Sequence, residues 1–198
     1  MTQVVPLRAR PSHEATTARI GMIVFVAGWT MMFGALLVAY LLLRTGQPEG
    51  ASWPSAGLPR VPRALPTVAT CVLLASSGTL ALAVGSIRAA RPRALIRWLW
   101  MTLLLALVFL GLQTTTWLRM RHLGLAPGAS LYASSFFGLT LFHALHVIVG
   151  MLGLLSLLPR SYRGAFSAHG HTAVQSWALY WHFVDVAWIA FYVAVVVW

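Results

Sequence analysis

The last apolar run of the sequence, 174–198, contains the hexapeptide Tyr180-Trp181-His182-Phe183-Val184-Asp185, and this stretch constrains how the rest of the chain must fold. Asp185 is one of only three acidic residues among 198. A carboxyl group at the centre of a membrane helix costs about 2.5–3.5 kcal/mol on insertion scales. The Asp185 side chain is therefore predicted to face protein, inside a bundle of helices, rather than lipid.

The composition supports a membrane protein and argues against a nucleic-acid-binding one. The chain is 59% hydrophobic and 9% charged, whereas soluble domains have about 25% charged residues. All 14 basic residues are arginine, which gives a net charge of +11. These arginines lie at the ends of apolar runs, where they mark membrane boundaries, and are not clustered as on a DNA-binding surface. The single cysteine, Cys71, excludes a disulfide framework and a thiolate metal site.

Five apolar runs reach the length of about 20 residues that a helix needs to cross a bilayer. They cover approximately 19–43, 65–87, 95–118, 131–158 and 174–198. The sequence therefore predicts an all-α, polytopic membrane protein. Residues 1–17 form a cytoplasmic N-terminal segment, and residues 18–198 form a single five-helix membrane domain.

The arginines also predict an orientation. Nine of them lie on the side of the N-terminus, in 1–19 and in the second and fourth connections, and five lie on the opposite side. Because arginine is enriched on the cytoplasmic side of membrane proteins, the N-terminus is predicted to be cytoplasmic and the C-terminus outside.

Small residues follow one stripe of the first run, at Gly21, Gly28, Ala35 and Ala39. Such stripes let membrane helices approach closely. The fourth run repeats this device next to polar residues, because His143, His146, Gly150 and Gly153 share one helical face.

A polar cluster is predicted where the fourth and fifth runs meet, formed by His143, His146, His182 and Asp185. Three readings compete: ligation of a haem iron or metal, a proton or solute relay, and an interhelical hydrogen-bond clamp worth about 0.6 kcal/mol per bond. The clamp is the default, with Asp185 accepting a hydrogen bond from a histidine. On this reading Asp185→Leu loosens the fold or the association with a partner.

Several segments resemble subunit III of the haem-copper respiratory oxidases, the cytochrome c oxidase family. The match is strongest over 180–188, which includes Tyr180, Trp181, Phe183 and Trp188, and next strongest over 132–137, 139–140, 143–147 and Gly150. Weaker matches include 21–23, 33–35, Trp53-Pro54, 73–76 and Gln113. In order and spacing they cover nearly everything after residue 18. The five runs resemble the last five helices of the seven-helix members, as in short bacterial forms.

The resemblance implies a non-redox accessory subunit of an oxidoreductase complex in the bacterial cytoplasmic membrane, with no catalytic centre, cofactor or metal of its own. Its main partner would be catalytic subunit I, followed by subunit II and further small subunits; haems and copper would lie in these partners. The implied fold is a V-shaped bundle in which the first two helices splay from the last three and bound phospholipids fill the cleft. Support of proton uptake is a further implied role.

The sequence departs from the family at three positions where glutamates are usual: Trp29, Thr116 and Gln175. None of these side chains can ionise as a carboxyl does, so the departures favour a structural role over proton collection. They also leave open a related accessory protein of a nitric oxide reductase. A small transporter or haem-binding membrane protein is the more distant alternative.

Two further groups of residues are candidates for binding. Arg44, Arg60, Arg63 and Trp53, in or next to the connection 45–63, are candidate lipid contacts because basic clusters at helix ends attract anionic head groups. His169 and His171 could bind a metal or collect protons, although such link histidines are more often simply solvated.

Overall fold

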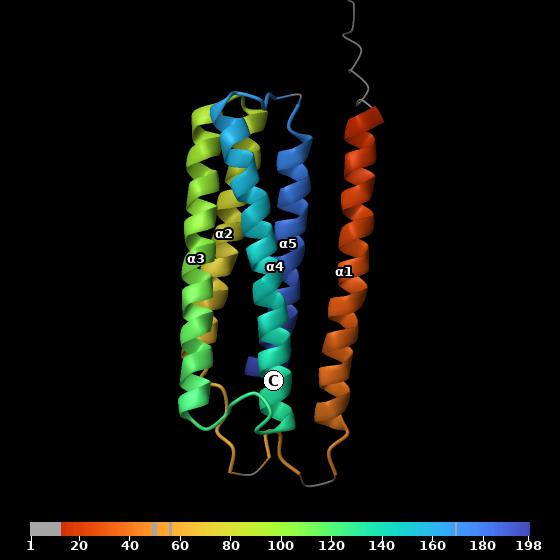
Figure 1. The fold of residues 1–198 in the computed structure, drawn as a ribbon, viewed down its shortest axis with the longest axis vertical. Helices are drawn as coiled ribbons and strands as arrows, with labels where there is room; N and C mark the ends of the chain where they lie inside the picture. The colour runs from red at the N-terminus through yellow and green to blue at the C-terminus, as the bar shows by residue number, and fades with distance from the viewer. Residues whose placement is uncertain (1–12, 49–50, 56, 169) are drawn as a thin grey trace, which may run out of the picture.

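The computed structural model describes residues 13–48, 51–55, 57–168 and 170–198, and its regular structure in these ranges is helical (Figure 1). The helices are α1 (His13–Thr45), α2 (Ala64–Arg88), α3 (Pro92–His122), α4 (Leu131–Tyr162) and α5 (Thr172–Tyr192), which a short π-helix, η1 (Val193–Val197), continues. Each predicted span coincides with one of these elements, so the all-α, five-span prediction is confirmed. The predicted segment 1–17 lies largely outside the described residues, and α1 begins within it.

All five helices are long and apolar enough to cross a membrane. Their lengths run from 21 residues in α5, before η1 extends it, to 33 in α1. At 1.5 Å per residue, about 20 residues span the roughly 30 Å of hydrocarbon in a bilayer. The chain is therefore a multi-pass membrane protein.

Local sequence signals set where the helices begin and end. α4 starts at the N-cap Ser130, whose side chain accepts a hydrogen bond from the Ala133 amide. Proline occupies the first position of α3, where no backbone donor is needed. α4 ends before Gly164, whose φ of +68° lies in the left-handed region that terminates many helices. These signals keep the connections between α2 and α3 and between α4 and α5 short.

The helices form a four-helix group, α2–α5, with α1 standing partly apart (Figure 1). α2 packs along α3 and also contacts α5, while α1 contacts α5 and, to a lesser extent, α4. The predicted V, with the first two helices splayed from the last three, is therefore wrong in its grouping. Side-chain hydrogen bonds join α2 to α3, and the α5 tryptophans donate to α2 hydroxyls, so α2 stays in the group and only α1 diverges.

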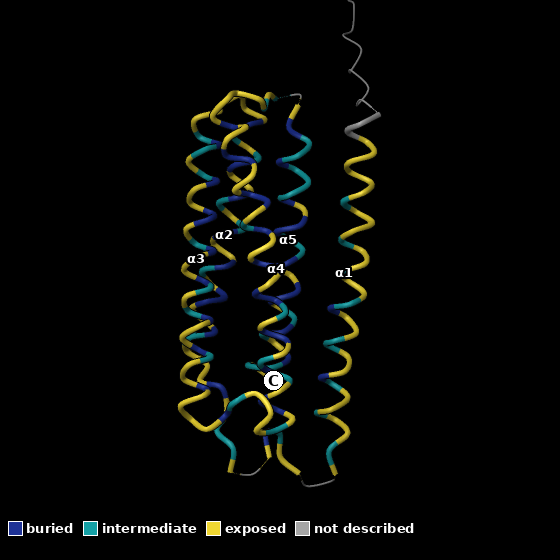
Figure 2. The backbone as a smooth tube through the Cα atoms, viewed as in Figure 1, coloured by how far each residue is buried: buried dark blue, intermediate teal, exposed yellow. Residues whose placement is uncertain are grey.

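α1 uses an aromatic face, rather than its small residues, to contact the bundle. Phe33 and Tyr40 are buried and Trp29 is half-buried, whereas Gly21, Gly28, Ala35 and Ala39 are exposed. A Cβ added at Gly21 or Gly28 would meet nothing within 4 Å. The prediction that this stripe packs closely is wrong for the contacts within the described chain. Most of α1 is exposed (Figure 2), which suits a helix that lipid surrounds.

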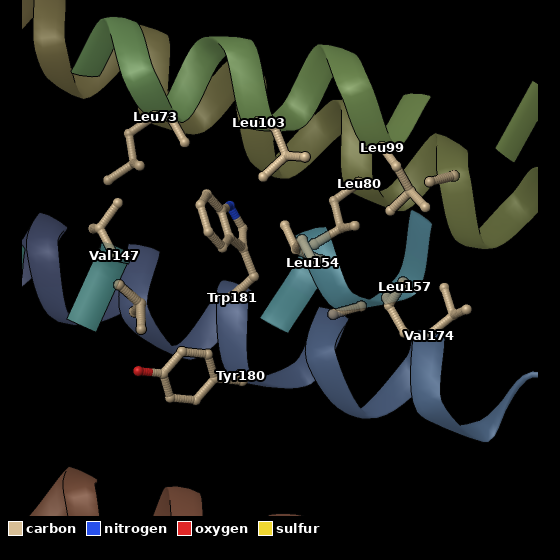
Figure 3. Packing of buried hydrophobic residues seen from close by; sticks show 14 of the residues in the cluster. Leu73, Leu80, Leu99, Leu103, Val147, Leu154, Leu157, Val174, Tyr180 and Trp181 are labelled. Carbon is tan, nitrogen blue, oxygen red and sulfur yellow. The ribbon is translucent and has the colours of Figure 1, made fainter. Parts of the chain in front are cut away.

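The main core lies between α2, α3, α4 and α5, with Trp181 near its centre. In Figure 3 the Trp181 indole points from α5 toward α2 and α3, between Leu73, Leu103 and Leu154, while Tyr180 points to the other side of α5. Trp181 and Tyr180 are each 1% exposed. The two aromatic side chains therefore anchor opposite faces of the same helix turn.

The glycine stripe of α4 makes room for these aromatics, as predicted. A Cβ added at Gly150 would lie 2.8 Å from Trp181 Cε3, and one added at Gly153 would overlap the Trp177 ring. Only glycine lets α4 and α5 approach this closely at these two positions.

Candidate functional site

The segment 180–188 of α5 is tied to α2 by hydrogen bonds from its tryptophans. Trp188 Nε1 donates to Thr70 Oγ1 at 2.9 Å, and Trp181 Nε1 donates to Ser76 Oγ at 3.1 Å. All four side chains are buried. Since lipid cannot satisfy an indole N–H, each bond stabilises the antiparallel pair α2–α5.

Two further polar contacts extend this row along the same helix pair. Ser77 Oγ lies 2.5 Å from His182 Nδ1, and Thr67 Oγ1 lies 2.8 Å from the Tyr192 hydroxyl. From Thr67 to Ser77 on α2, the partners on α5 run from Tyr192 back to Trp181 and His182, over about three turns of each helix. We call this set of four hydrogen-bonded pairs the α2–α5 polar row.

The opposite side of the motif contacts α4 and α1. The Tyr180 hydroxyl donates to the His146 carbonyl at 3.1 Å. Phe183 packs against Phe33 of α1, with ring centroids 5.7 Å apart. The motif therefore joins α5 to three neighbouring helices.

The two α4 histidines lie among aromatic rings. His146 Nδ1 lies 2.7 Å from the Phe142 carbonyl of its own helix, and the His146 ring meets Trp29 edge-on at 4.3 Å. His143 is fully buried, with the Trp188 ring 4.8 Å away, and neither of its ring nitrogens has a hydrogen-bond partner among the described residues. Both histidines help to fill the bundle.

Asp185 does not accept the predicted hydrogen bond from a histidine. The carboxyl is 3% exposed, and neither oxygen has a hydrogen-bond partner among the described residues. The Ser77 hydroxyl lies near enough to the carboxyl to act on it as a donor, but its contact within hydrogen-bond distance is His182 Nδ1. The predicted cluster of His143, His146, His182 and Asp185 is thus not one hydrogen-bonded unit, because its members have separate surroundings.

The metal and haem readings find no support in the arrangement of ligands. Within the described ranges, no three histidine, cysteine or acidic side chains come together as a metal site would require. The rings around His143 and His146, namely Trp29, Phe33 and Trp188, occupy the space beside the imidazoles. The interhelical hydrogen bonds that the structure shows join α5 to α2 instead, and His182 is the member of the predicted cluster that takes part in them.

The three positions at which the sequence analysis expects glutamates in the family hold side chains with neighbours in this structure. Trp29 packs against His146, and Thr116 is buried with its hydroxyl donating to the Leu112 carbonyl of its own helix. Gln175 Nε2 lies 3.0 Å from His171 Nε2 in the first turn of α5. Trp29 thus joins α1 to α4, whereas Thr116 bonds within α3 and Gln175 bonds at the start of α5.

The candidate lipid contacts come together at one end of the molecule. Arg44, Arg60, Arg63 and Trp53 line a single pocket beside the end of α5. Of the two link histidines, His171 is nearly buried and bonded to Gln175, whereas His169 lies outside the described residues.

Sequence reasoning missed the α2 half of the polar row. Thr67, Thr70 and Ser77 follow one helical stripe at intervals of three and seven residues, with Ser76 beside them. Hydroxyl side chains at that spacing in an apolar run share one helical face. They indicate a polar stripe that contacts a neighbouring helix.

Comparison with known proteins gives the same family as the motifs. A family model described as cytochrome c oxidase subunit III matches residues 12–198. The chain is 38% identical to cytochrome c oxidase subunit 3 of Thermostichus vulcanus over 180 residues, which are 90% of this chain and 86% of that protein. It is 32% identical to the protein of the same name from Corynebacterium diphtheriae, over 96% of this chain and 92% of that protein. The Latimeria chalumnae protein is 37% identical over 91% of this chain and 69% of its own length. The chain therefore belongs to the cytochrome c oxidase subunit III family.

Proposed function

We propose that this chain is an accessory subunit of a haem-copper terminal oxidase, which stabilises the catalytic subunit without redox chemistry of its own. The observation that carries the proposal is that the α5 motif 180–188 makes hydrogen bonds to neighbouring helices. Trp181, His182 and Trp188 bond to α2, and Tyr180 bonds to α4. The motif thus holds helices together, which is what a scaffold subunit requires.

The proposed partners follow from the family. Catalytic subunit I is the main contact, and subunit II and smaller subunits complete the complex. Exposed apolar side chains such as Ile20, Val24 and Met31 cover the outer face of α1. In a membrane, such a surface is suited equally to lipid and to a partner helix.

A structural role fits better than proton collection. Trp29, Thr116 and Gln175 contact their own helices, a histidine or aromatic neighbours. Asp185 is enclosed by the bundle. Proton uptake supported by glutamates at the family positions is therefore not part of the proposal.

Lipid holding has support from a groove on the outer surface between α3 and α4. The groove is apolar and is lined by Trp100, Leu104, Leu107, Ile148 and Leu152, among others. Its apolar lining is suited to an acyl chain, which needs apolar surface and no hydrogen bonds. This groove differs in place from the cleft predicted between the first two helices and the last three.

The membrane and orientation are also proposals. We place the chain in a bacterial cytoplasmic membrane with its N-terminus in the cytoplasm. The ends of the helices support this, because the arginines of α1's start and of the α2–α3 and α4–α5 connections lie at one end of the bundle (Figure 1). The more arginine-rich end is cytoplasmic in most membrane proteins.

The test is to isolate the complex through a tag on this chain and to measure its optical spectrum, copper and iron. Haem and copper should accompany the complex, and both should be absent from the chain after it is dissociated and re-purified. Haem retained by the isolated chain would overturn the accessory role. Non-haem iron in place of copper beside the catalytic haem would instead identify a nitric oxide reductase complex.

A further inference from the structure

Three arginines line one pocket at the end of the bundle where α1 ends, α2 begins and α5 continues into η1. Arg44 belongs to α1, Arg60 to the following connection, and Arg63 precedes α2. The pocket has a cavity volume of about 40 Å³ and opens to solvent, so it can take one compact group and not a whole drug-sized ligand, for which about 300–1,000 Å³ is typical. None of its lining side chains is acidic.

Most of the guanidinium donors in this pocket are not used by the protein. Arg44 donates to the Ala194 and Trp198 carbonyls, at 3.0 and 2.5 Å. Arg63 makes one long bond of 3.3 Å to the Val197 carbonyl, and Arg60 makes no hydrogen bond to a described residue. Each guanidinium carries five N–H groups, so the three together present a surplus of donors and of positive charge.

Aromatic side chains complete the pocket and place it at the depth of a membrane interface. Tyr40, Trp53, Tyr132 and Trp198 line it. Trp53 Nε1 donates to the Tyr40 hydroxyl at 3.2 Å, and the Arg44 guanidinium lies 4.3 Å above the Trp198 ring. Tryptophan and tyrosine are enriched where the hydrocarbon of a bilayer meets its head groups.

We propose that this pocket binds the phosphodiester head group of an anionic phospholipid. Arginine is suited to this ligand because its planar fork bonds phosphate oxygens in pairs. The surrounding rings match the interfacial region of the lipid, and head groups are the most concentrated phosphates at that depth. The site is separate from the groove between α3 and α4.

The bound head group would join parts of the chain that are otherwise loosely connected. Most of α1 stands apart from the bundle (Figure 1), but its end meets η1 through Arg44. A phosphate held by Arg44, Arg60 and Arg63 bridges α1, the connection and the start of α2. This inference rests on the proposed membrane placement and is independent of which catalytic complex the chain serves.

The test measures lipid binding by native mass spectrometry on the purified complex that contains the full chain. The complex is titrated with phosphatidylglycerol, with phosphatidylcholine of the same acyl chains, or with inorganic phosphate. The variant Arg60→Gln/Arg63→Gln removes two charges but leaves the Arg44 bonds in place. Arg119→Gln/Arg121→Gln is the matched control, because these two arginines are exposed at the same end of the bundle and outside the pocket.

The wild type and the control should retain one phosphatidylglycerol at least about tenfold more tightly than phosphatidylcholine, and Arg60→Gln/Arg63→Gln should lose this preference. Equal losses in both variants would overturn the site, since they would indicate only general surface charge. Inorganic phosphate competing as well as the lipid would indicate a soluble anion and overturn the lipid assignment. Loss of a partner subunit with lipid binding unchanged would assign the arginines to a protein contact. Arg60→Gln alone, which breaks no bond to a described residue, keeps the test valid if the double variant does not fold.

Discussion

At the scale of single residues, several buried polar atoms lower the stability of this protein, because they lack hydrogen-bond partners among the described residues. Both carboxyl oxygens of Asp185, both ring nitrogens of His143 and Nε2 of Gln113 have none among the described residues. A buried polar group left unpaired costs about 1–3 kcal/mol. These atoms therefore reduce the stability of the isolated chain, in contrast to the neighbouring tryptophans.

Asp185→Leu is expected to leave the thermal stability of the complex unchanged or to raise it. Leucine has the same branching as aspartate and removes two unpaired oxygens, a change that is neutral or stabilising when no partner is lost. Thr140→Val is the control: the Thr140 hydroxyl accepts from Trp117 Nε1 at 2.9 Å, so its loss should destabilise. Thermal unfolding in detergent measures both. A marked loss of stability in Asp185→Leu would restore the original clamp hypothesis.

Gly150→Ala is expected to destabilise the protein by about 1–3 kcal/mol, because overpacking forces neighbouring side chains and helices to move. The added methyl would lie 2.8 Å from Trp181 Cε3. Gly138→Ala on the same helix, where a Cβ meets nothing within 4 Å, should stabilise by about 0.5–1 kcal/mol. Equilibrium unfolding in mixed micelles compares the two variants. Similar effects at both glycines would contradict the close approach of α4 and α5.

At the scale of elements, the α2–α5 polar row explains why α2 joins the bundle and α1 does not. Apolar side chains give little preference for a helix neighbour over lipid, so directional bonds and close packing decide which helices pair. α2 also bonds to α3, through Thr79 and Thr102 at 2.8 Å. α1 offers mainly aromatic contacts along its length and its arginine at the end.

A double-mutant cycle on Trp188 and Thr70 should give a coupling free energy of about 0.6 kcal/mol and no more than about 1.7 kcal/mol, as for other hydrogen bonds between membrane helices. The variants are Trp188→Phe, Thr70→Val and the double change. The free-energy cost of replacing the Trp188 indole by a smaller phenyl ring cancels in the cycle, because it is the same whether residue 70 is threonine or valine. The coupling is calculated from the unfolding free energies of the wild type, the two single variants and the double variant. A coupling of zero would show that the 2.9 Å contact does not stabilise the helix pair.

At the scale of the whole molecule, the two ends of the bundle differ in the arginines and aromatic residues that they carry. One end carries the α2–α3 and α4–α5 connections with Arg88–Arg97, Arg160 and Arg163, and the other carries the arginine pocket. The long connection after α1 supplies Trp53 and Arg60 to that pocket. The two ends thus carry different numbers of arginines, and the pocket proposed to bind an anionic head group lies at one of them.

Cysteine labelling should establish the orientation. In a Cys71→Ala background, Ser55→Cys in the first connection should react with a membrane-impermeant maleimide in spheroplasts. Ala165→Cys, in the link between α4 and α5, should react only after the membrane is opened. Both positions are exposed, so accessibility is limited by the bilayer alone. The opposite pattern would reverse the proposed topology.

The sequence by itself determined the class of fold, because five apolar runs of sufficient length permit little other than membrane helices. It also determined the family, through the motif around Trp181, and the close approach at Gly150 and Gly153, since small residues on one helical face predict a tight neighbour. The spans predicted from these patterns coincide with the helices found. All of these properties depend on residues close together along the chain.

Only the tertiary structure decided which side chains meet. It joined Trp181 and Trp188 to hydroxyls on α2, left Asp185 without the expected histidine, and separated α1 rather than α1 and α2 together. It also brought Arg44, Arg60 and Arg63 around one pocket. The physical reason is that a helical stripe specifies only a face. Which helix lies against that face depends on the packing of all five, and no local pattern contains that information.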